Sequence, residues 1–121
     1  MNTGTVVPKS VNLGETATIL MRCVGALQTL ITQASLTSIT RRTVNTTTGV
    51  VIETGTVVVI ATSVFDTGQT DEGWANAAAP YNFKDRITAS SAGNVTVEYS
   101  FTDTSSRVTI GTAKLAVNAL P

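Results

Sequence analysis

The chain has 121 residues, a formal net charge of zero and no histidine, and only 13% of its residues are charged. A chain of this length forms one domain of ordinary size. Its neutral charge excludes the basic field with which proteins attract nucleic acid or an anionic membrane surface, so we expect neither partner.

Threonine is the most prominent residue type, with 23 copies, and valine is next in prominence. Side chains branched at Cβ fit a pleated strand better than a helix, so the composition predicts an all-β domain. A free monomer normally keeps charge on its surface for solubility. A neutral surface rich in small hydroxyl residues therefore suggests that neighbouring subunits cover much of it.

The first twelve residues form a region of their own. They are rich in Thr and Val, and Pro8 is typical of an edge strand, so we predict an extended arm or edge strand over 1–12 and the main domain over 13–121. The stretch has neither a basic segment nor an apolar core of the kind found in secretory signals. We expect a chain made in the cytoplasm without a signal peptide.

Glu15–Val24 alternates between apolar and polar residues with the period of a strand. A further strand is predicted over Leu36–Val44. The segment 25–35 between them is predicted to be a loop or a single helical turn. Asn45–Gly49 has the composition of a tight turn. A return strand over Val50–Glu53 is then predicted.

The second half of the chain continues in short strands. We predict a second turn at Thr54–Gly55 and an apolar strand over Thr56–Ala61, extended after a bulge by Ser63–Phe65. A long connection over Gln69–Pro80 follows. The remaining strands are predicted over Tyr81–Ala89, Val95–Phe101 and Arg107–Val117.

Seven or eight short strands separated by turns are typical of an antiparallel sandwich of immunoglobulin-like type. The last two strands should form a hairpin within one sheet. A jelly roll or a small β-barrel is the alternative fold.

Catalytic and metal-binding constellations are missing from the sequence. Without histidine the chain lacks the commonest general base and metal ligand. Asp66, Asp71 and Glu72 lie in one loop, but their spacing does not match a calcium-binding EF-hand. Cys23 has no second cysteine to pair with and is expected to be a small buried residue. We predict no catalytic, cofactor-binding or metal-binding residue, and no enzymatic activity.

The aromatic residues of the same loop have two interpretations. Trp74 and Tyr81 could stack on a sugar or a base. They could instead close one end of the core or contact a neighbouring subunit, because a sandwich of this length needs large side chains and has few others. We favour the core or interface and retain the ligand platform as the alternative.

Three segments resemble a group of short immunoglobulin-like proteins of tailed phages and prophage-like regions of bacteria. The segments are LGETATI at Leu13–Ile19, TVNTTTGVVIETGTVVV at Thr43–Val59 and SVFDTGQTDEGWANAAAPYNF at Ser63–Phe83. The third is the most specific, and its matching residues are expected to have a structural role. They are Phe65, Asp66, Gln69, Asp71, Trp74, Tyr81, Asn82 and Phe83.

The resemblance implies a virion structural protein without catalytic activity or a cofactor. Related modules occur in capsid-decoration and baseplate proteins, so the implied partners are major capsid or tail subunits, in a homo-oligomer or many-copy assembly. The implied location is the virion, with synthesis in the host cytoplasm. The alternative function is a carbohydrate- or receptor-binding module that uses Trp74 and Tyr81.

Overall fold

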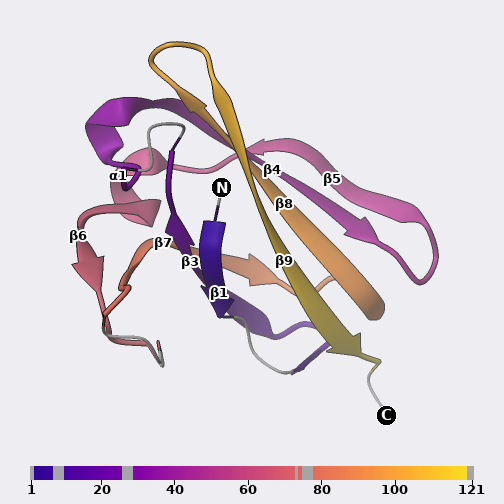
Figure 1. Ribbon diagram of the computed structural model, residues 1–121. Helices are drawn as coiled ribbons and strands as arrows, with labels where there is room; N and C mark the ends of the chain where they lie inside the picture. The colour runs from indigo at the N-terminus through magenta and orange to yellow at the C-terminus, as the bar shows by residue number, and fades with distance from the viewer. Residues whose placement is uncertain (1, 7–9, 26–28, 73, 75–77, 120–121) are drawn as a thin grey trace.

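The computed structural model describes residues 2–6, 10–25, 29–72, 74 and 78–119, with the backbone alone for residues 2–6. The described residues are arranged in two sheets (Figure 1). The first has four strands in the order β1 (Asn2–Val6), β3 (Thr16–Cys23), β7 (Tyr81–Thr88), β6 (Val64–Gln69). The second has five in the order β2 (Val11–Asn12), β9 (Val108–Asn118), β8 (Gly93–Asp103), β4 (Leu36–Asn45), β5 (Val50–Val57).

Neighbouring strands run antiparallel, except that β2 lies parallel to β9. Buried residues of both sheets form one hydrophobic cluster, so the sheets pack face to face around a common core. The all-β prediction is confirmed. The region 1–12 contributes an edge strand to each sheet, with β1 pairing to β3 and β2 to β9.

Strict alternation decides which face enters the core on the two long strands β8 and β9. On β8, Val95, Val97, Tyr99 and Phe101 are buried, whereas the residues between them are partly exposed. The long strand β9 follows the same rule and pairs with β8 as a hairpin in the middle of its sheet. Because a period of two fixes the face of every side chain, these strands were predictable from sequence.

The centre of the core is aromatic. Phe83 of one sheet meets Tyr99 and Phe101 of the other, with ring centroids 4.8 Å and 5.1 Å apart in edge-to-face arrangements. Gly111 faces this cluster from β9, where an added Cβ would lie 2.9 Å from the Met21 sulfur. A side chain at Gly111 would therefore force Met21 to move.

The predicted turn at Thr54–Gly55 and strand over Thr56–Ala61 are wrong. β5 continues through this point, with Glu53 paired to Thr43 and Thr56 paired to Arg41 on the same neighbour. The extra residue forms a bulge, which Gly55 permits through a positive φ of 67°. After Val57 the chain leaves the sheet and forms the single helical turn α1 (Ile60–Ser63).

The chain crosses between sheets through short helical turns. The 3-10 turn η1 (Gln33–Ser35) precedes β4, which agrees with the predicted loop or single turn. α1 precedes β6, so Ser63–Phe65 does not extend the preceding strand but leads into the other sheet. In the described part of the chain, no helix has the length and apolarity needed to cross a membrane.

Replacing Phe101 by Ala tests the aromatic centre of the core. The side chain is 1% exposed, so the truncation should lower the free energy of unfolding by about 3–5 kcal/mol in urea denaturation followed by circular dichroism. Val57→Ala is the matched control, because Val57 is 76% exposed and its loss should change stability by about 0.5 kcal/mol or less. Equal effects of the two substitutions would contradict the assigned core.

Candidate functional site

The motif over Ser63–Phe83 folds into the end of α1, strand β6, a connection and the start of β7. Residues 73 and 75–77 of that connection lie outside the described residues. The Tyr81 ring sits between Phe65 and Trp74, with centroids 5.9 Å and 5.6 Å away. Tyr81 is only 1% exposed. The motif therefore gathers Phe65, Trp74 and Tyr81 into one group, whereas its fourth aromatic residue, Phe83, lies in the centre of the core.

Trp74 and Tyr81 differ in what they offer to a ligand. Tyr81 has almost no free ring surface, and its hydroxyl donates to the Asp71 carboxylate. Trp74 is half-buried, and its indole Nε1 donates to the Ala79 carbonyl at 2.9 Å. Stacking on a sugar would rest on the exposed part of Trp74. Burial, followed by the contact with Asp71, raises the Tyr81 pKa, so the phenol stays protonated.

The acidic and amide side chains of the motif make contacts within the fold. Asp66 accepts a hydrogen bond from the Gln33 backbone at 2.8 Å, which ties β6 to the η1 turn. Gln69 donates to the Thr67 carbonyl and hydroxyl at 3.0 Å and 3.2 Å. Among the described residues, no group of three or more potential ligands is placed to hold a metal ion.

Asn82 is a buried polar residue that links three chain segments. Its Oδ1 accepts from the Cys23 backbone nitrogen at 2.7 Å. Its Nδ2 donates to the carbonyls of Cys23 and Ile31 at 3.0 Å and 2.8 Å. The side chain thus links β7 to the end of β3 beyond their last paired residues, Met21 and Phe83. Buried backbone groups need such partners because water cannot reach them.

Cys23 lies at the end of β3 and is 1% exposed. Burial raises the pKa of its thiol to about 12. The reactive thiolate form is therefore negligible at neutral pH. The expectation of a small buried cysteine is confirmed.

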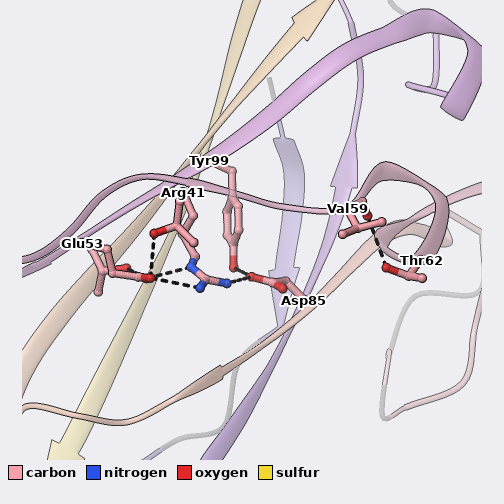
Figure 2. Close-up of polar contacts among 8 residues, drawn as sticks. Arg41, Glu53, Val59, Thr62, Asp85 and Tyr99 are labelled. Atoms are coloured by element: carbon pink, nitrogen blue, oxygen red, sulfur yellow. Dashed lines mark hydrogen bonds and ion pairs between the residues drawn. The ribbon is translucent and has the colours of Figure 1, made fainter.

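The structure also reveals a polar cluster that the sequence analysis did not identify (Figure 2). Arg41 on β4 pairs with Glu53 on β5, with Nε–Oε1 and Nη2–Oε2 distances of 2.7 Å and 3.1 Å. Its Nη1 lies 2.7 Å from Oδ2 of Asp85 on β7. Tyr99 donates to the same Asp85 oxygen at 2.6 Å. Arg41 therefore links Glu53 of the five-stranded sheet to Asp85 of the four-stranded sheet.

The electrostatics of the cluster favour its charged form. Glu53 accepts four hydrogen bonds, two from Arg41 and one each from Thr43 and Thr56. The bond to Arg41 is the main cause that lowers the Glu53 pKa to about 2, and burial opposes it. The same bond raises the Arg41 pKa, and burial raises the Tyr99 pKa. At neutral pH Arg41 and Tyr99 therefore stay protonated and Glu53 stays deprotonated. Such a cluster is suited to joining strands.

Arg41 carried one sequence signal. Ile39 and Thr43, two residues before and two residues after Arg41, are buried, whereas Arg42 points outward. The strand period therefore places Arg41 on the inner face. A charged residue at an inward position requires a partner of opposite charge. The sequence did not show that the partners would be Glu53 and Asp85, because they come from different strands.

A cavity of about 470 Å³ lies beside Arg41 and Glu53, between the sheets. β6 pairs with β7 only from Tyr81 to Phe83, so the four-stranded sheet is narrower at the other end of β7. The resulting opening exposes apolar side chains of the core together with polar residues at its rim. The apolar lining consists of Ile52, Ile87, Ala89, Val95, Leu115 and Val117.

Comparison with known proteins gives no relatives. No family model, no curated protein and no solved structure matches the chain.

Replacing Asn82 by Ala tests the buried amide. The substitution removes the Asn82 partners of the Cys23 backbone nitrogen and the Ile31 carbonyl, and it should lower the free energy of unfolding by about 3 kcal/mol in urea denaturation. Asn118→Ala is the control, since its 3.5 Å contact with Asn12 is exposed and its loss should have an effect of about 0.5 kcal/mol or less. A stable N82A variant would contradict the clamp.

The lowered pKa of Glu53 predicts a pH dependence. The carboxylate stabilises the fold above its ordinary pKa of 4.5, and this contribution is lost as the pH falls from there through about 2. After allowance for solvent screening it amounts to about 1–2 kcal/mol. Chemical denaturation between pH 7 and pH 2 should therefore show a shallower loss of stability for Glu53→Gln than for the wild type.

Glu15→Gln provides the control for this series, because it removes one exposed carboxylate outside the cluster. The control should follow the wild-type curve more closely than the Glu53→Gln variant does. Parallel curves for the wild type and Glu53→Gln would show that the Arg41–Glu53 pair does not stabilise the fold.

Proposed function

We propose that the chain is an immunoglobulin-like structural module of a tailed-phage virion, which binds neighbouring subunits through its sheet surfaces. The phage context rests on the resemblance of the Ser63–Phe83 motif. The observation that carries a contact function is the group of large apolar side chains exposed on the five-stranded sheet and next to it. They are Val50, Val51, Val57, Val59, Val108 and Ile110.

The strand order supports the immunoglobulin-like assignment. Lettered by that fold, β1, β3, β7 and β6 follow the order A, B, E and D of its first sheet. β9, β8, β4 and β5 follow the order G, F, C and C′ of its second sheet. The short strand β2 lies beside G. Such sandwiches serve many functions, so the contact surface must support the role of the module.

The surface chemistry is suited to protein contacts. Val57 is 76% exposed and Val108 58% exposed, and threonine and serine occupy much of the sheet around them. Burying such side chains stabilises a contact by about 25 cal/mol per Å² of apolar surface, and no charge has to be removed from water. In a particle with many copies, weak contacts of this kind become strong together.

The polar groups support a structural role. The carboxylates of Glu53 and Asp85 are tied to Arg41, and the Cys23 thiol is buried and protonated. The Arg41 contacts with Glu53 and Asp85 link the two sheets. A module with rigid sheets presents its outer surface in one geometry, which repeated contacts in a lattice require.

Quantitative mass spectrometry of purified particles tests the proposal. The particles come from the phage or prophage whose genome carries the gene, and the chain should be present in a constant ratio to the major capsid or tail protein. A non-structural protein of the same genome measures contamination. Recovery of the chain at no more than this background level would reject the virion role.

A further inference from the structure

The outer face of the five-stranded sheet is a regular array of side chains. We define it by the outward residues of β5, β4, β8 and β9, which the pairing registers place in rows across the sheet. One row holds Val57, Thr40, Ser100 and Ile110; the next holds Arg42, Glu98 and Thr112; the third holds Val51, Val44, Thr96 and Lys114. A fourth row continues with Thr102 and Val108.

The charges of this outer face lie close to its centre. Arg42 on β4 stands directly opposite Glu98 on β8, the two middle strands of the array. Neither takes part in an ion pair with any other residue that the structure describes. The rows on both sides of this pair are uncharged except for Lys114 on β9.

We propose that a second copy of the chain docks on this outer face, with a two-fold axis that runs along the strands between β4 and β8. This rotation places β4 of each copy over β8 of the other. Arg42 of each copy then faces Glu98 of the other, which forms the same intermolecular ion pair twice. Packed sheets lie about 10 Å apart, which is within reach of these two long side chains.

The same rotation matches the uncharged rows. It places β5 of each copy over β9 of the other, so Val57 meets Ile110, whose side chains are 76% and 43% exposed in the single chain. Thr40 meets Ser100 between them. In the third row Val51 faces the aliphatic stem of Lys114, whose amine can remain in water at the rim. The outer face is thus complementary to itself.

The charge pattern selects this axis over the other simple choice. A two-fold axis across the strands through the middle row would stack Arg42 on Arg42 and Glu98 on Glu98 of the second copy. Like charges placed together oppose association. An isologous dimer with the axis along the strands avoids this contact and pairs every central charge with its opposite.

The size of the outer face sets the strength of the dimer. Four strands about 4.8 Å apart, each contributing about six residues, cover roughly 400 Å² in projection. The two copies together would then contribute roughly 800 Å², which is below the roughly 1,200 Å² at which stable specific interfaces begin, so the dimer should be weak and exchange rapidly. The inference rests on the proposed function only in treating this face as a contact surface.

Sedimentation velocity of the purified chain over a concentration series tests the dimer. The wild type should show a monomer–dimer equilibrium, and Arg42→Glu should weaken the association about a hundredfold, because it creates two like-charge contacts per dimer. Glu98→Arg should have the same effect. The double variant R42E/E98R should restore association, because it exchanges the charges and keeps both pairs.

Arg86→Glu is the matched control, since Arg86 is an exposed arginine on β7 of the other sheet and its reversal should leave the dimer unchanged. Ile110→Asp gives a second disruption independent of the charge pair. Thermal unfolding by circular dichroism verifies that each variant is folded. A wild type that stays monomeric, or a dimer that withstands both Arg42→Glu and Ile110→Asp, would overturn the proposal.

The test also separates the dimer from the virion role. A folded chain that dimerises as predicted but is missing from particles refutes the proposed function and supports the dimer. A monomeric chain that is a constant component of particles refutes the dimer and supports the proposed function.

Discussion

One guanidinium group joins the two sheets at their open side. Arg41 binds Glu53 within its own sheet and Asp85 across the core, with contacts of 2.7 Å to each carboxylate. The chain has a single cysteine, so no disulfide within it can do this work. The geometry of the sandwich at this side therefore depends on charges that are only partly exposed. Breaking such a pair by removing one partner costs more than the pair contributes, because a charge is left without compensation.

The fold could be predicted from sequence wherever one side chain period decided the structure. The alternation in β3 and β8 made both strands predictable. The bulge at Gly55 could not be distinguished from a turn, because glycine permits a positive φ in both. The apolar residues over Thr56–Ala61 likewise did not show that α1 would begin at Ile60. There the transfer of the chain from one sheet to the other decides the structure.

The candidate site was less predictable than the fold, for a physical reason. The Ser63–Phe83 motif was expected to have a structural role, and among its described residues Phe65, Trp74 and Asp71 contact Tyr81. The Arg41 cluster assembles residues from β4, β5, β7 and β8, and their proximity is a product of strand order. The spacing of residues in the sequence does not identify such partners. The inward position of Arg41 shows only that this residue needs a partner of opposite charge.

The parallel pairing of β2 with β9 has a mechanical consequence. The two strands run in the same direction, with Val11 beside Val117 and Asn12 beside Asn118. The N-terminal part of the chain leads into β2, and the C-terminus follows β9. Tension applied between the two ends therefore pulls these strands past each other along their length. Their hydrogen bonds are loaded together in shear, where an antiparallel hairpin pulled at its open end would separate one bond at a time. In a module tethered by its ends, this short parallel pair would resist extension in shear once the β1–β3 pair, which lies nearer the N-terminus, has been loaded.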